Sequence, residues 1–70
     1  MIELLRLNDP VRLSYLIAML RDGGVEPVVL DTHMSVLEGS LIAIPRRLMV
    51  ADDDAEQARR ILREAGELDG

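Results

Sequence analysis

The residues with the clearest chemical potential lie in the middle of the chain, in the segment Asp31-Thr32-His33-Met34-Ser35. In an extended segment Asp31, His33 and Ser35 share one face, and their residue types match those of a hydrolase triad. A working triad needs its members on separate rigid elements, with an oxyanion hole beside the nucleophile. Three residues spaced two apart in one segment provide neither, so the sequence does not predict an enzyme.

Metal binding would draw on the same region, where Asp31, His33 and Glu38 carry suitable ligand atoms. The chain has one histidine and no cysteine, whereas zinc sites usually draw several nitrogen or sulfur ligands from fixed positions. The aspartates at 52–54 lack the alternating ligands, central glycine and distant glutamate of an EF-hand. Acidic residues are instead favoured at the start of a helix, where they accept backbone N–H bonds. We therefore expect no metal ion and no other cofactor.

The charge balance argues against a nucleic-acid partner. All eight basic residues are arginine, and the formal net charge is −5 at pH 7. Arg46 and Arg47 are adjacent, and adjacent strand residues point to opposite faces, so the two do not form one clamp. With one aromatic residue in the chain, there is also no platform on which bases could stack.

Length and composition indicate one small folded domain. Of the 70 residues, 49% are hydrophobic, which argues against intrinsic disorder. No apolar run approaches the roughly 18 residues of a membrane helix, and charges near the start interrupt any secretory signal. The absence of cysteine excludes disulfides. We predict a cytoplasmic protein without a membrane partner, with a single domain over 1–66 and a frayed tail over 67–70.

The first half of the chain predicts a strand, a helix and a strand. Residues 2–7 form an apolar run too short for a helix and are predicted to be a strand. An Asp-Pro pair then gives a typical helix start, so a helix is predicted over 10–22, ending at two glycines. A second strand is predicted over 25–30, at a sheet edge, because Pro27 cannot donate a ladder hydrogen bond.

The second half predicts a loop over 31–42, a strand over 44–51 and a helix over 52–65, closed by Gly66. A right-handed crossover between the first two strands leaves a gap, which the third strand fills antiparallel to both. The predicted fold is an α+β two-layer sandwich of order β-α-β-β-α with strand order 1-3-2. This is a ferredoxin-like arrangement without its last strand.

Helices can cover only one face of this sheet, so apolar side chains elsewhere need another cover. If the first strand alternates regularly, its leucines are divided between the two faces. A domain of this size buries only about 60% of its unfolded surface, so self-association is a natural source of stability. We therefore predict a homo-oligomer or a protein partner, with an interface formed by Leu5, Leu7, Val11, Tyr15, Met19 and Met49.

The loop over 31–42 is the second candidate site. Long connections are uncommon in so small a domain and are often functional. The residues predicted to bind there are Asp31, His33, Met34 and Glu38. Two alternatives stay open, since the loop either folds back on the open sheet face or docks on a partner.

Three segments, in this order and spacing, resemble one family of small bacterial domains. They are Asn8-Asp9-Pro10, Val28-Val29-Leu30-Asp31 followed by His33-Met34-Ser35, and Ile44-Pro45-Arg46-Arg47-Leu48-Met49-Val50 before the acidic run. The resemblance covers residues 1–66, and the family is described as putative prokaryotic signal-transducing proteins. It implies a fold similar to the nitrogen-regulatory PII proteins, which are ferredoxin-like.

In PII proteins the connection between the second and third strands docks on targets, and the 31–42 loop takes the equivalent place. This loop is far shorter and no nucleotide-binding signature is recognised, so the resemblance does not imply binding of ATP or 2-oxoglutarate. We predict a non-enzymatic regulatory or interaction module that acts through the 31–42 loop and the open sheet face. The alternative is a sensor that holds a small metabolite between loop and sheet.

Overall fold

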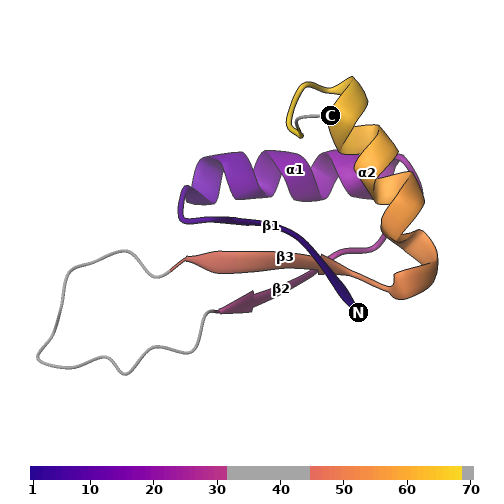
Figure 1. Cartoon of the computed structure of the whole chain (residues 1–70). Coiled ribbons are helices and arrows are strands. Elements are labelled where there is room, and N and C mark those ends of the chain that lie inside the picture. Colours follow the sequence, from indigo (N-terminus) through magenta and orange to yellow (C-terminus); the bar gives the residue numbers. More distant parts are fainter. Residues whose placement is uncertain (32–44, 69–70) are drawn as a thin grey trace, which may run out of the picture.

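A computed structural model describes residues 1–31 and 45–68 of the chain. In these ranges the elements are β1 (Ile2–Leu7), α1 (Pro10–Asp22), β2 (Val28–Asp31), β3 (Arg46–Val50), a 3-10 turn η1 (Asp52–Asp54) and α2 (Ala55–Glu64). Both helices lie on the same side of the sheet (Figure 1). The predicted α+β fold and the predicted order of its elements are confirmed.

Helix α1 has the predicted bounds because both of its ends carry specific signals. Oδ1 of Asp9 accepts hydrogen bonds from the backbone N–H groups of Val11 (3.0 Å) and Arg12 (3.3 Å). Pro10 occupies the first turn, where a missing N–H costs no helical bond. After the helix, Gly24 has a φ of 88°, a left-handed conformation that glycine adopts without steric cost.

The second strand begins later than the predicted residue 25. The N–H of Val25 donates to the carbonyl of Leu20 at 2.8 Å, and the Val25 side chain is buried. Val25 therefore belongs to the connection that follows α1, where its side chain packs into the core, and it is not the first residue of a strand. Pro27 lies just before β2, and β2 is at an edge of the sheet as predicted.

The acidic run forms η1, and α2 begins after it, at Ala55. Asp54 is the N-cap residue of α2, but its side chain makes no capping hydrogen bond. Its backbone N–H donates to the carbonyl of Ala51 at 2.9 Å, and Asp52 forms an ion pair with the amino group of Met1. The prediction that this run caps the helix through its side chains is therefore wrong for Asp54.

The three described strands pair in the order β1-β3-β2, and both neighbouring pairs are antiparallel. Along β1 and β3, Glu3 lies opposite Met49, but the next residue opposite β3 is Leu5, which faces Leu48. Leu4 is thus an extra residue, which makes a β-bulge in the edge strand.

The bulge changes which way the end of β1 faces. Leu5 lies opposite Leu48 and Leu7 opposite Arg46, on the face against which the helices pack. Leu7 is only 9% exposed and belongs to the core, while Leu5 packs partly against it. The prediction that Leu5 and Leu7 face away from the helices is therefore wrong, because regular alternation does not continue across a bulge.

The core lies between the helices and the sheet. Helix α2 packs closely on the end of α1, where Nε2 of Gln57 donates to the carbonyl of Gly23 at 2.7 Å. A Cβ at Gly23 would overlap the side chain of Ile61, so glycine allows this close approach. The largest fully buried side chains are those of Leu16, Leu20, Val25, Leu48, Val50 and Leu62.

Beyond α2, the chain still packs against the rest of the fold at Glu67 and Leu68. The N–H of Glu67 donates to the carbonyl of Leu62 at 2.8 Å, and Oε1 of Glu67 lies 2.8 Å from Nη2 of Arg12. Leu68 packs against the core. The prediction of a frayed tail from residue 67 is therefore wrong for Glu67 and Leu68.

Candidate functional site

The predicted loop site lies almost entirely outside the described residues. Asp31 is the last residue of β2, and its backbone lies opposite Arg46 of β3. The other predicted binding residues, His33, Met34 and Glu38, are not among the described residues. Their role stays a prediction. The described part of the candidate site is the sheet that leads into this loop.

The face of the sheet turned away from the helices carries two rows of side chains that cross all three strands. Leu48 and Val50 point into the core, so the residues that alternate with them on β3 point the other way. The strand registers then define one row as Glu3, Met49 and Val28, and the other as Arg6, Arg47 and Leu30. These six residues are called the open face below.

The open face has an apolar half and a charged half. On β2, Val28 is 37% exposed and Leu30 is half-buried. On β1, Nε of Arg6 donates to Oε2 of Glu3 at 2.9 Å, across the bulge. Met49, predicted as an interface residue, lies in the first row but is only 9% exposed. The apolar character available to a ligand on this face therefore comes mainly from β2.

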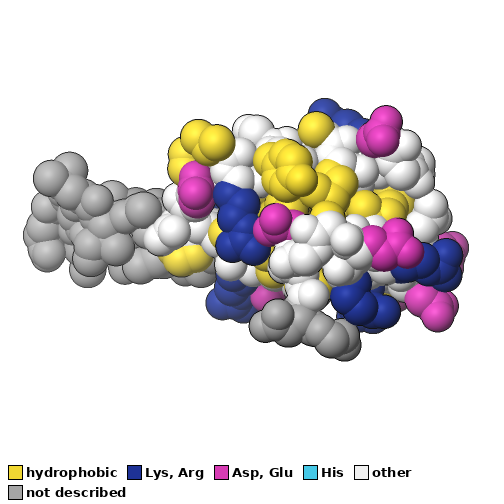
Figure 2. Space-filling model, turned by 90° about the horizontal axis from the view of Figure 1, so that it is seen from above, with side chains coloured by type: hydrophobic (Ala, Val, Ile, Leu, Met, Phe, Trp, Pro, Cys, Tyr) yellow, Lys and Arg dark blue, Asp and Glu magenta, His cyan; other side chains and the backbone are white. Residues whose placement is uncertain are grey.

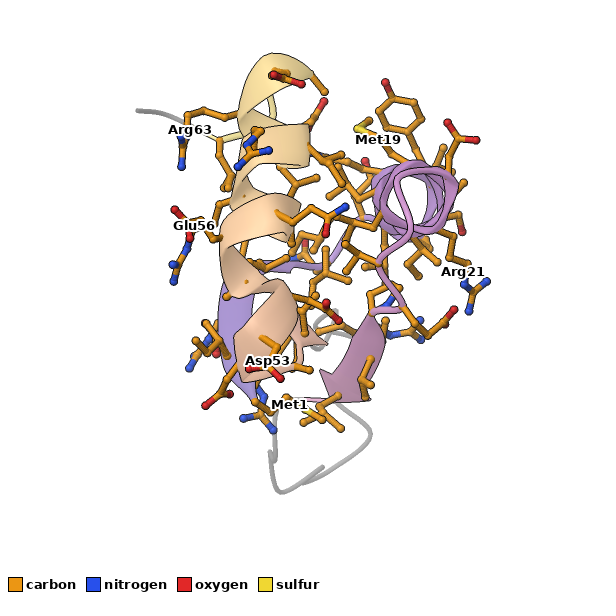
Figure 3. All side chains as sticks on the ribbon, turned by 90° about the vertical axis from the view of Figure 1, so that its right-hand side faces the viewer. Met1, Met19, Arg21, Asp53, Glu56 and Arg63 are labelled. Atoms are coloured by element: carbon orange, nitrogen blue, oxygen red, sulfur yellow. The ribbon has the colours of Figure 1, made fainter. Side chains whose placement is uncertain are left out.

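Helix α1 presents a second apolar surface, formed by Val11, Tyr15 and Met19 and called the outer face of α1 below. These residues are one turn apart and lie on a different side from the core residues of the helix. Val11 is 78% exposed and Tyr15 is 55% exposed. Met19 is half-buried and lies between the helices (Figure 3). Their role as an interface stays a prediction.

Seen from the helical side, hydrophobic side chains reach the surface between charged groups (Figure 2). Two exposed ion pairs join α1 to neighbouring segments, one near each of its ends. Arg12 pairs with Glu67, and Nη2 of Arg21 lies 2.8 Å from Oε2 of Glu26. The hydrogen bond to Glu26, together with its negative charge, raises the pKa of Arg21 above its ordinary value.

The described ranges, 1–31 and 45–68, contain no group of three or more His, Cys, Asp or Glu residues that could hold a metal ion. Within the same ranges no polar or charged residue is fully buried.

None of the described helices has the length and apolar character that crossing a bilayer requires.

The sequence contains a signal for the bulge that sequence reasoning missed. Glu3 and Arg6 are separated by two leucines, and charged residues three apart in a regular strand would point to opposite faces. When one of the two leucines between them is an extra, bulged residue, Glu3 and Arg6 point to the same face of the sheet. The bulge thus brings the carboxylate and the guanidinium together and keeps both out of the core.

Comparison with known proteins gives a family match over most of the chain. Residues 1–66 match the model of a family described as "Putative prokaryotic signal transducing protein". The match spans both helices and all three described strands. No curated protein matches the chain.

Proposed function

The chain belongs to the family described as putative prokaryotic signal transducing protein, and from this premise we propose that it transmits a signal by binding proteins, without catalysing a reaction. The family description supports the signalling role. The exposed apolar surfaces support protein binding as the way in which the signal is transmitted. The proposed partners are another protein and a second copy of the chain. As the sequence suggests, the proposed location is the cytoplasm. Residues 1–66, together with the packed Glu67 and Leu68, are proposed as the functional domain.

The observation that carries the proposal is the apolar half of the open face. Val28 and Leu30 lie two residues apart on edge strand β2, on the side of the sheet opposite the helices. Burying a valine or leucine side chain completely stabilises a complex by about 1.5–3 kcal/mol relative to leaving it exposed. Val28 is 37% exposed and Leu30 is half-buried, so a partner that covers them gains the fraction of this energy that belongs to their remaining exposed surface. The same two strands, β2 and β3, lead into the loop that the sequence predicts to take part in binding.

The charged half of the open face restricts the partner further. Glu3 and Arg6 form an exposed ion pair, which adds little affinity but disfavours a wholly apolar partner surface. The proposed partner is a protein surface with apolar side chains opposite β2 and polar or charged side chains opposite β1.

Affinity capture with three immobilised proteins tests this proposal. The wild type is compared with Val28→Asp, which places a charge on the open face, and with Val11→Asp, which places one on the outer face of α1. We expect a protein that both the wild type and Val11→Asp bind, while Val28→Asp binds it at least tenfold more weakly in calorimetry. Equal binding by all three proteins, or loss with Val11→Asp alone, would contradict the use of the open face.

One observation favours metabolite sensing as a second candidate function. Arg6 and Arg47 lie directly opposite each other on the open face, so two guanidinium groups share one side of the sheet. Guanidinium groups are suited to binding carboxylates and phosphates. A thermal-shift screen of anionic metabolites should then give a selective stabilisation that Arg47→Gln removes. Equal shifts in the wild type and in Arg47→Gln would count against a site at these arginines.

A further inference from the structure

Among the strands that the structure describes, β1 lies at an edge of the sheet. In the strand order β1-β3-β2 it lies at one end and pairs, among the described strands, with β3 only. The N–H and C=O groups along the outer edge of such a strand are a template for adding another strand. The opposite edge strand, β2, has four residues and follows Pro27, whereas β1 has six residues and contains no proline. β1 is therefore the longer template, and the bulge at Leu4 restricts the registers in which a second strand can pair with it.

We propose that the outer edge of β1 pairs with β1 of a second copy of the chain, antiparallel and about a two-fold axis. Such an interface is isologous, because the same six residues serve both protomers. The inference deepens the self-association included in the proposed function. It does not depend on a partner at the open face, because it uses the main-chain edge of β1.

The directions of the β1 side chains restrict the register of this pairing. Leu5 and Leu7 point to the helical side, and Glu3 and Arg6 belong to the open face. Residues directly opposite each other in an antiparallel pair point to the same side of the sheet. The open-face residues of one copy must therefore lie opposite open-face residues of the other.

Three registers satisfy this condition. Glu3 lies opposite the second copy's Glu3, or Arg6 lies opposite its Arg6, or Glu3 lies opposite its Arg6. The first two place like charges directly opposite each other, which destabilises a strand pair, and overlap only part of the strand. The third places opposite charges together twice, once on each side of the two-fold axis.

The third register also overlaps the whole of β1. Ile2 then lies opposite Leu7, and the two leucines of the bulge, Leu4 and Leu5, lie opposite each other in the two copies. The apolar residues thus meet on the helical side while Glu3 and Arg6 alternate on the open face. The charge pattern and the position of the bulge therefore both favour β1 of a second copy as the strand that pairs with this edge.

The resulting sheet has the order β2-β3-β1-β1-β3-β2. With the two-fold axis perpendicular to the sheet, the helices of both protomers lie on one face and the two open faces become continuous. Self-pairing would therefore satisfy the main-chain edge and double the surface available to a further partner.

Complementary charge reversal tests the register and the occupant together. Glu3→Arg gives a chain with two arginines on the open-face side of β1, and Arg6→Glu gives one with two glutamates. Each variant alone places like charges opposite each other, so its dimer should dissociate at least tenfold more readily than the wild type. A mixture of the two variants pairs each arginine with a glutamate and should form a heterodimer about as stable as the wild-type dimer. Sedimentation velocity and native mass spectrometry give the populations.

The exposed pair Arg21 and Glu26 supplies the matched control, because Arg21→Glu and Glu26→Arg reverse charges away from β1. These variants should dimerise like the wild type, both alone and mixed. A fold defect in Glu3→Arg or Arg6→Glu could weaken each variant alone, but it could not be rescued by mixing. A wild type that stays monomeric at high micromolar concentration would overturn the proposal. So would a wild-type dimer that neither reversal weakens, or variants whose mixture stays monomeric.

Discussion

Asp9 and Asp54 occupy the same position at the starts of α1 and α2, but only Asp9 bonds to its helix through its side chain. Replacing Asp9 with alanine leaves the N–H groups of Val11 and Arg12 without this acceptor. We expect Asp9→Ala to lower the free energy of unfolding by about 1 kcal/mol. Asp54→Ala should change it by less than about 0.5 kcal/mol. Urea denaturation followed by circular dichroism measures both, and equal losses would contradict the difference between the caps.

A Cβ at Gly23 would lie 3.2 Å from Cγ1 of Ile61 and closer still to its Cδ1, so an alanine there requires the Ile61 side chain to shift. Gly23→Ala should therefore lower the free energy of unfolding by about 1 kcal/mol through overpacking. Ile61→Val removes the Cδ1 methyl and should relieve the overlap, so the two substitutions together should cost less than their separate costs added. A double-mutant cycle, measured by denaturation, gives this coupling free energy. If the two losses simply add, the Cβ introduced at position 23 does not contact Ile61.

Residue types predicted the helix ends well and the strand starts less well. The Asp-Pro pair and the two glycines bound α1 correctly, because capping and left-handed backbone are local properties. The β-branched residues that follow Val25 predict a strand that includes it. The N–H of Val25 is instead bonded to the carbonyl of Leu20, a competition between partners that the residue type alone does not reveal.

At the scale of elements, the bulge in β1 determines which leucines reach the core. Deletion of Leu4 gives a strand that alternates regularly, with Glu3 still opposite Met49 and Leu5 still opposite Leu48. We expect this variant to keep the fold and to lose about 1–2 kcal/mol of unfolding free energy, since Leu4 is only partly buried. Deletion of Arg6 should cost more, because it turns Leu7 out of the core.

Nuclear Overhauser contacts between β1 and β3 report on the register in these deletion variants. Retained contacts between Glu3 and Met49 after deletion of Leu4 would confirm that this leucine is the extra residue. A strand that shifts its register after this deletion would contradict the bulge at that position.

The faces of β1 could not be predicted from period-two alternation, because one extra residue reverses every side chain after it. Regular alternation predicts that Leu5 and Leu7 face away from the helices, whereas Leu7 is in the core. The packing of Glu67 and Leu68 after α2 could not be predicted for a similar reason. It depends on contacts with Arg12 and with the core, which are distant in sequence and leave no local pattern.

At the scale of the whole molecule, topology was the most predictable property. The right-handed crossover rule placed β3 between β1 and β2, and Pro27 independently placed β2 at an edge. The candidate site was less predictable. Its loop residues His33, Met34 and Glu38 lie outside the described part of the chain, and the open face emerges only once the register is known.

The position of β1 at an edge of the described sheet is also a property of the whole molecule, because it depends on which strands pair with which. Amide hydrogen exchange, measured residue by residue at low and at high protein concentration, tests most directly whether a second copy completes the sheet there. We predict that amides within residues 2–7 exchange at least tenfold more slowly at high concentration, while those of β2 stay unchanged. Exchange of residues 2–7 that is independent of concentration, or slowing confined to the outer face of α1, would contradict pairing through β1.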